Sequence, residues 1–141
     1  MSSHTEWTVE EAVTRLTDAD KHVRLEAAGA LAALGKKAKA AVPALIKALD
    51  DAEAPVRKMA ALALGDIGRR ARPAVPALIR VLKDADENVR RRAAIALGEI
   101  GDEDGSVTAA LRQTAADPHP AVRRAALAAL HTLADAMAQS A

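Results

Sequence analysis

A period of 33 residues runs through the chain and constrains its fold more than any other feature. Valines recur at this step; each is followed by an arginine, and an aspartate stands five residues before it. The valines are Val23, Val56, Val89 and Val122, and a leucine column holds Leu31, Leu64, Leu97 and Leu130. Columns that share one register indicate stacked copies of a small unit that cannot bury its apolar face alone.

Each unit has the pattern of two helices. In the second unit, one helical face with i, i+3, i+4, i+7 spacing is formed by Val42, Leu45, Ile46 and Leu49. Pro43 fits the first turn of this helix, and Pro55 fits the first turn of the next, because no N–H donor is needed there. Gly68 suits a left-handed cap at the end of the second helix. The sequence therefore predicts an all-α chain of helix pairs.

The expected architecture is one domain, residues 1–141, folded as a right-handed alpha-alpha superhelix of four helix pairs. The predicted repeats are 8–40, 41–73, 74–106 and 107–141. Thr8 and Glu11 form a T-x-x-E capping box at the first helix, with Trp7 as the preceding hydrophobic staple. Aromatic residues are 1% of the chain, so alanine and leucine must build the core through close helix packing.

Several kinds of chemistry lack the residues they need. The chain has no cysteine, which excludes disulfides and thiolate metal sites, and no apolar run long enough to span a membrane. His4, His22, His119 and His131 have no metal-ligand spacing. Met1–Glu6 is polar and does not resemble a signal peptide, so we expect a cytoplasmic protein. We expect no catalytic residues, no metal and no cofactor.

The sequence resembles the short HEAT-like repeat of phycobilin-lyase-type proteins, and artificial HEAT-like alpha-repeat proteins are also similar. The resemblance rests on A-V-P-A-L-I at 41–46 and 74–79, on D-x-x-x-x-V-R in all four units, and on A-A-x-A-L-G-x-I-G at 60–68 and 93–101. It implies a curved, armadillo-like solenoid whose second helices line the concave side. It also implies that the aspartate and arginine columns link adjacent repeats.

Two enzyme-related families share this repeat. The deoxyhypusine hydroxylases, which the chain also resembles, bind iron through His-Glu pairs two and three residues after the valine. Here that slot holds Leu25 and Glu26 in the first unit, Lys58 and Met59 in the second, and no histidine in any unit. We therefore reject that activity. A bilin-lyase-like accessory role is a weaker alternative, because the chain is short for one and has no distinctive chromophore motif.

The constant charged columns have two structural explanations. The aspartates can cap the second helices or accept hydrogen bonds from a neighbouring arginine. One charge per unit is what stacked repeats need, so we predict a structural ladder. Its members are Asp18, Asp51, Asp84, Asp117, Arg24, Arg57, Arg90 and Arg123.

Function is expected where the columns vary. Positions two, three, six, nine and ten after the valine differ between units, and their spacing places them on one face of the second helices. This face mixes an apolar centre with charged edges, a composition that suits a protein interface. The predicted partner-binding residues are Leu25, Lys58, Met59, Leu62, Asp66, Arg91, Arg92, Ile95, Glu99, Arg124 and His131. The expected function is a protein–protein interaction module or scaffold that binds a protein or peptide on the concave face.

Basic turns provide the alternative function. Lys36, Lys37 and Lys39 align with Arg69, Arg70 and Arg72, and two stacked basic turns could contact nucleic-acid phosphates. The next turn is acidic, at Asp102–Asp104, and almost no aromatic side chain is available for base stacking. The formal net charge is only +1. We therefore favour a protein partner over nucleic acid and expect no membrane partner.

The last helix, predicted over Val122–Met137, differs from the other second helices. Leu127, Leu130, Leu133 and Met137 leave it little polar covering. A terminal repeat of a solenoid needs a polar outer face. Either a homodimer forms through this apolar C-terminal helix, or the chain belongs to a longer array.

Overall fold

The computed structural model describes residues 6–140, and every regular element in that range is helical. The helices pair in chain order: α1 (Val9–Arg15) with α2 (Lys21–Leu34), α3 (Val42–Ala48) with α4 (Ala54–Ile67), α5 (Val75–Val81) with α6 (Glu87–Ile100), and α7 (Ser106–Thr114) with α8 (Pro120–Ser140). The predicted all-α solenoid of helix pairs is confirmed. Residues 1–5, which include His4, and residue 141 lie outside the described range.

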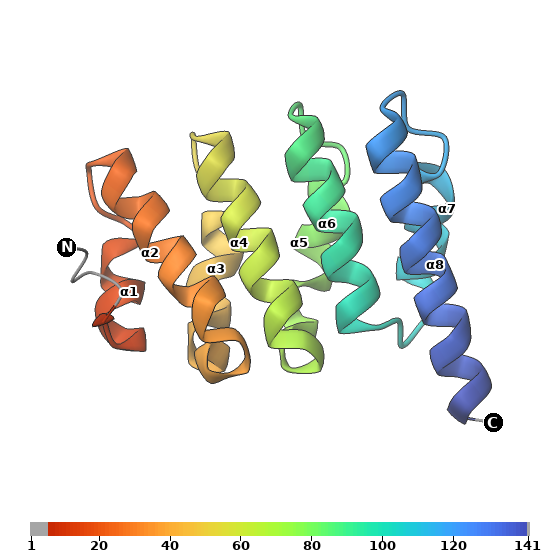
Figure 1. The fold of residues 1–141 in the computed structure, drawn as a ribbon, viewed down its shortest axis with the longest axis horizontal. Helices are drawn as coiled ribbons and strands as arrows, with labels where there is room; N and C mark the ends of the chain where they lie inside the picture. The colour runs from red at the N-terminus through yellow and green to blue at the C-terminus, as the bar shows by residue number, and fades with distance from the viewer. Residues whose placement is uncertain (1–5, 141) are drawn as a thin grey trace.

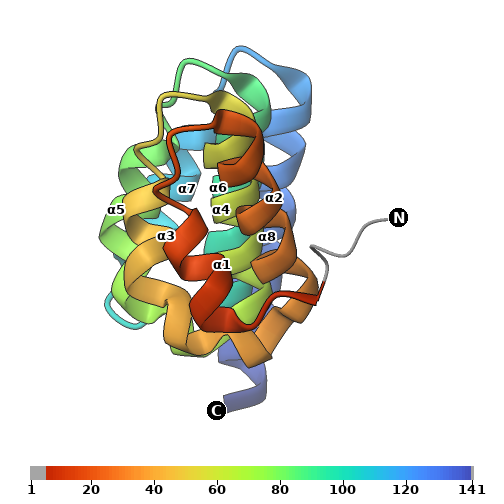
Figure 2. The ribbon, with the colours of Figure 1, turned by 90° about the vertical axis from the view of Figure 1, so that its left-hand side faces the viewer.

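The helices form two layers. The second helices α2, α4, α6 and α8 stand side by side in Figure 1, with the first helices α1, α3, α5 and α7 behind them. Figure 2 shows the same two layers from the N-terminal end of the stack. Each second helix packs mainly against the second helix of the next pair. One layer is therefore a continuous row of parallel helices, on which equivalent positions of successive units lie in lines.

The core lies between the layers and consists of aliphatic side chains. Leu31, Leu64 and Leu97 of the second helices are fully buried, as are Leu45 and Leu78 of the first helices. Alanines occupy most of the remaining core positions. Small side chains let the helices approach closely, which is how the chain forms a dense interior almost without aromatic residues. No helix in residues 6–140 is both long and apolar enough to cross a membrane.

The predicted capping box is present at α1. The Glu11 N–H donates to Thr8 Oγ1 at 3.1 Å, and the Thr8 N–H donates to Glu11 Oε1 at 2.9 Å. Trp7 packs against the core, and the guanidinium carbon of Arg15 lies 4.5 Å from the centre of its ring. These contacts satisfy the first N–H groups of the helix and attach the N-terminal end of the stack.

The glycines that end the second helices differ in form from the prediction. Gly35, Gly68 and Gly101 have φ of 56°, 77° and 108°, but their ψ values of −130°, −140° and 170° lie outside the left-handed helical region. The left-handed cap is therefore wrong, although this backbone region is still essentially restricted to glycine. Gly35 and Gly68 each begin a short 3-10 segment, η2 (Gly35–Ala41) and η3 (Gly68–Ala74), which leads into the next first helix.

The last helix is longer than predicted. It extends over Pro120–Ser140, whereas the apolar pattern ended at Met137. Its C-terminal end projects beyond the other second helices (Figure 1).

Candidate interaction surface

The arginine column joins each helix pair to the next. Arg57 donates from Nε to Asp84 Oδ2 at 2.7 Å and from Nη2 to Asp84 Oδ1 at 3.0 Å. Arg24 makes the same two-pronged contact with Asp51, and Arg90 makes it with Asp117. Such bidentate pairs are among the strongest hydrogen bonds available to side chains.

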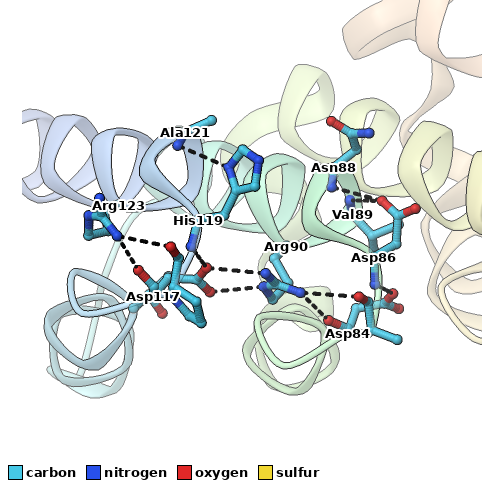
Figure 3. Close-up of polar contacts among 12 residues, drawn as sticks. Asp84, Asp86, Asn88, Val89, Arg90, Asp117, His119, Ala121 and Arg123 are labelled. Carbon is cyan, nitrogen blue, oxygen red and sulfur yellow. Dashed lines mark hydrogen bonds and ion pairs between the residues drawn. The ribbon is translucent and has the colours of Figure 1, made fainter.

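Each arginine also fastens its own turn. Arg90 Nη1 donates to the carbonyl oxygens of Asp84 at 2.8 Å and Ala85 at 3.3 Å, and Figure 3 shows its guanidinium between Asp84 and Asp117. One side chain therefore connects its own turn to the turn of the following unit. In this column the donors of Arg24, Arg57 and Arg90 are used within the fold and are not free for a partner.

The aspartates of the ladder do not cap the second helices, so that alternative is wrong. The residues at the N-cap positions of α2, α4 and α6 are Asp20, Glu53 and Asp86. The ladder aspartates lie two residues earlier and accept the N–H of that later residue, as Asp84 does from Asp86 at 2.9 Å. This is an Asx-type turn that shapes the approach to the helix.

The ladder carboxylates are held in their ionised form. Burial by itself would raise the pKa of Asp84. The hydrogen bonds from Arg57 and the Asp86 N–H, together with the charges of Arg57 and Arg90, outweigh burial and leave the pKa below its ordinary value. Burial is likewise outweighed by hydrogen bonds and nearby charges at Asp51, whose pKa is lowered by Arg24 and Arg57, and at Asp117, whose pKa is lowered by Arg90 and His119.

The ladder is open at both ends of the described structure. The Asp18 carboxylate accepts the Asp20 N–H at 2.8 Å and no arginine within residues 6–140, although the Asp18 carbonyl oxygen accepts Arg24 Nη1 at 2.9 Å. Arg123 donates from Nη1 to the carbonyl oxygens of Asp117 and Pro118 (Figure 3) and pairs with no carboxylate in residues 6–140.

The variable positions of the second helices lie away from the buried stripe of Val56, Ala60 and Leu64. The predicted partner-binding residues among them are half-buried or exposed, whereas the glycines at the same variable positions, Gly65 and Gly98, are buried. We call this surface the second-helix face. Its residues are Leu25, Lys58, Met59, Leu62, Asp66, Arg91, Arg92, Ile95, Glu99 and Arg124.

Two carboxylates of this face lie close together across adjacent helices. Asp66 and Glu99 occupy the same column of α4 and α6, and Glu99 Oε1 fills the space above Gly65 that a Cβ there would need. Burial raises the pKa of Glu99, the charge of Asp66 raises it further, and Arg92 offsets this only in part. The face therefore has an acidic spot with an incomplete counter-charge.

His131 lies in the column that forms the seam between second helices at α4 and α6. Its column contains Gly65 and Gly98, where a Cβ would lie 3.0 Å from Ala96 Cα and 2.8 Å from Ala129 Cβ, respectively. Glycine thus permits the close approach of α4, α6 and α8. On α8 no helix follows within the described residues, and the His131 side chain is 79% exposed, 3.5 Å from Asp135.

Comparison with protein-family models identifies the family of this chain. A family model described as HEAT repeats matches residues 9–75 and again residues 75–140. The chain belongs to the HEAT-repeat family. No curated protein sequence matches it significantly.

Solved structures with the same architecture include natural and designed proteins. The complex of CpcE and CpcF of phycocyanin lyase from a Nostoc species contains a chain of 33% identity and TM-score 0.71; the match covers 89% of this chain and 54% of that one. A designed armadillo repeat protein in complex with the peptide (KR)4 has 26% identity and TM-score 0.77, with coverage of 89% and 64%. An engineered protein has 28% identity and TM-score 0.70, with coverage of 90% and 62%. This HEAT-repeat chain spans less than two thirds of each of them.

The basic turns of this HEAT-repeat chain are partly neutralised. The six lysines and arginines of η2 and η3 are exposed, but Arg72 forms an ion pair with Glu103 of the next, acidic connection. Asp102 in that connection accepts the N–H groups of Gly105, Val107 and Thr108 and the Thr108 hydroxyl. The acidic turn is therefore the N-terminal cap of α7, a role that sequence reasoning missed although Asp-x-x-Gly before a helix could have indicated it.

Hollows occur between the first helices of this HEAT-repeat chain. One of about 730 Å³ is lined by Val13, Leu16, Pro43 and Ala44, between α1 and α3. Another, of about 480 Å³, lies beside Arg72, Val75 and Ile79. The titratable groups that line them include Arg24 and Asp51 in the first and Arg72 and Glu103 in the second, and each of these pairs is an ion pair of the fold. Within residues 6–140, no group of three or more histidine or carboxylate side chains could hold a metal ion.

Proposed function

We propose that this chain is an interaction module that binds a segment of a partner protein on its second-helix face. The observation that carries the proposal is the contrast between two sets of arginines. Arg24, Arg57 and Arg90 use their donors inside the fold, whereas Arg91 and Arg124 form no ion pair or side-chain hydrogen bond within the described residues. Cations that the fold does not use, beside half-buried Leu62 and Ile95, are the side chains that interfaces recruit.

The architecture supports the same function. The designed armadillo repeat protein among the structural neighbours holds a peptide, so a helical solenoid of this kind serves as a peptide-binding scaffold.

A displayed library of random 20-residue peptides, selected on the purified chain, tests the proposal. Selected peptides should bind the native chain and lose at least about tenfold in affinity when Leu62→Ser and Ile95→Ser are introduced together, a loss of about 1.4 kcal/mol. The matched control carries Lys47→Glu and Arg80→Glu, two exposed changes on the first helices. Equal binding by the Leu62/Ile95 variant, or equal loss in the control, places the site elsewhere. Circular dichroism at 222 nm establishes that both variants are folded.

A second candidate interaction is self-association through α8. Leu127 is 56% exposed and Met137 is 73% exposed, and these are the large apolar side chains that the described structure leaves most open. Sedimentation equilibrium of the native chain and of a Leu127→Ser, Met137→Ser variant measures it. A concentration-dependent dimer that the double substitution abolishes would support this interaction, and a monomer at millimolar concentration would rule it out.

A further inference from the structure

Seven of the ten residues of the second-helix face lie in three bands that run across the helices. Lys58, Arg91 and Arg124 each stand at the fifth residue of α4, α6 and α8, and form a cationic band near the helix N-termini. Leu62 and Ile95 form an apolar band at the ninth residue of α4 and α6. The third band is acidic: Asp66 and Glu99 stand in the last turn of the same two helices.

The bands follow from the parallel arrangement of the second helices (Figure 1). Because each pair repeats at 33 residues, equal positions line up from one helix to the next. The first unit departs from the pattern, since Leu25 occupies the cation column of α2 and Ala33 occupies the acid column. The cationic band therefore covers α4, α6 and α8, the acidic band covers α4 and α6, where Thr132 takes the equivalent position on α8, and both leave α2 out.

The spacing of the bands matches the width of a helix. Eight residues separate Arg91 from Glu99, which at about 1.5 Å of rise per residue places the two rows about 12 Å apart. An α-helix with its side chains is about 10–12 Å across, so one helix laid over the apolar band meets both charged rows. Neighbouring strands in a sheet lie only about 4.8 Å apart, so a single extended strand is too narrow to meet both.

The spacing along the bands also fits a helix. Packed helices lie about 8–10 Å apart, so the cations of α4, α6 and α8 recur at about that distance. A crossing helix rises about 10.5 Å in seven residues, which is two turns and returns to the same edge. Acidic residues placed seven apart would therefore meet successive members of the cationic band.

On these grounds we infer the partner's chemistry: an amphipathic helix of another protein crosses α4, α6 and α8, with one acidic edge on Lys58, Arg91 and Arg124 and one basic edge on Asp66 and Glu99. This inference rests on the proposed function and names the partner of the same face. The raised pKa of Glu99 agrees with it, since a cation arriving beside Asp66 and Glu99 relieves the repulsion between two carboxylates.

Two synthetic 21-residue peptides of identical composition test the inference. Both form a helix with a stripe of leucines along one face. In the segregated peptide, all glutamates lie on one side of the stripe and all lysines on the other, each at seven-residue spacing. In the mixed peptide, glutamates and lysines alternate on both sides of the stripe. Isothermal titration calorimetry should show the segregated peptide binding at least about tenfold more tightly, a difference of about 1.4 kcal/mol. Exchanging glutamate for lysine throughout is not a control, because the helix can turn round and bind in the opposite direction.

Charge exchange in the protein makes the test independent of the peptide design. Arg91→Glu with Arg124→Glu should weaken the segregated peptide at least about tenfold, and so should Asp66→Lys with Glu99→Lys. All four substitutions together exchange the charges of both bands at every position except Lys58, and should restore binding with the peptide reversed. A spin label at the peptide N-terminus reports that reversal. If it broadens NMR signals of α4 in the native chain, it should broaden those of α8 in the variant, and the converse holds if it starts at α8.

The outcomes separate this inference from the proposed function. The inferred partner, a helix with two charged edges, is refuted if the two peptides bind with equal affinity. It is also refuted if the variant with all four substitutions folds but does not recover binding. If library-selected peptides bind at Leu62 and Ile95 but neither synthetic peptide binds, the inferred helical partner is also wrong, whereas the proposed function as an interaction module is still supported. A library that yields no binder refutes the proposed function itself.

Discussion

Removing one carboxylate from the middle of the ladder should cost this small protein a large part of its stability. Asp84→Ala deletes two hydrogen bonds from Arg57, at 2.7 and 3.0 Å, and one from the Asp86 N–H at 2.9 Å. The side chains of Arg57 and Asp84 are only 17% and 11% exposed, so the guanidinium left behind loses its partner in a largely dry site. Breaking such a pair costs about 3–5 kcal/mol when water is excluded. The remaining exposure lets water reach Arg57, so we expect a loss of about 3 kcal/mol.

The chain itself supplies the matched control. Asp18 is in the same column but is exposed, and its carboxylate accepts only the Asp20 N–H within the described residues; its carbonyl oxygen, which accepts Arg24, is kept in the alanine variant. Asp18→Ala should therefore cost less than about 1 kcal/mol, the value of one exposed hydrogen bond. Urea unfolding followed by circular dichroism at 222 nm gives both free energies of unfolding by linear extrapolation.

The cost at Asp84 should depend on pH in a defined direction. The folded chain lowers the pKa of Asp84, so the carboxylate stabilises the fold above its ordinary pKa near 3.9 and ceases to do so as the pH falls through the folded pKa. The difference between the native chain and Asp84→Ala should be constant from about pH 6 to pH 8 and shrink below about pH 4. A loss no larger than that of Asp18→Ala, or one that does not change with pH, would refute the ladder as a source of stability.

Three other substitutions probe the remaining features. Glu99→Gln should raise the free energy of unfolding at pH 7, because burial and Asp66 raise the pKa of Glu99 in the fold; the gain should vanish in acid, where the native carboxyl is also neutral. Gly98→Val should cost about 1–3 kcal/mol in urea unfolding, since its Cβ would lie 2.8 Å from Ala129 Cβ on a packed helix. Asp102→Ala should cost about 1–2 kcal/mol and speed amide hydrogen exchange in α7, whose N-terminus it caps, while amides of α4 keep their protection.

The sequence was sufficient for the features that depend on local spacing. Within each 33-residue unit the apolar residues recur every three to four positions, as they do on the buried stripe of a helix, and two such stripes in each unit predict a helix pair. The capping box of Thr8 and Glu11 involves residues three apart, so the sequence alone specifies it. The variable residues Lys58, Leu62 and Ile95 could be placed on one face for the same reason, since equal steps from each valine mean equal angles around each helix.

Contacts between different units could not be predicted from local spacing in the sequence. The choice between helix cap and ladder for Asp51 depends on whether Arg24, 27 residues earlier, reaches it, and only the stacking distance decides that. The role of Asp102 depended on the backbone of Gly105, whose positive φ turns the chain into α7. The angle of His131 on its helix suits either the exposed face or the seam, and the seam is defined only by the close approach at Gly65 and Gly98, so its role as a partner contact stays a prediction.

The outer side of α8 corresponds to the side of α4 and α6 that packs against the next second helix, but it carries larger side chains. Leu127 occupies the column of Ala61 and Ala94, which are fully buried against the next second helix. His131 occupies the glycine column, where even a Cβ would collide with the following helix. A further helix of the same kind could not pack on α8 at the distance used inside the array, because two large side chains stand where alanine and glycine are required.

This geometry limits any partner of α8, including a second copy of the chain. The partner cannot repeat the stacking seen inside the array, even though Arg123 has donors left for a ladder contact. It must meet Leu127 and Met137 at a wider spacing, with side chains interdigitated in place of the close alanine–glycine contact. Replacing Leu127 by alanine and His131 by glycine restores the small residues of the internal seam, and should turn α8 into a surface that stacks end to end on the Asp18 end of another copy. Light scattering of this variant over a concentration series should show growing oligomers. A variant that stays in the same state as the native chain would show that these two side chains do not prevent stacking.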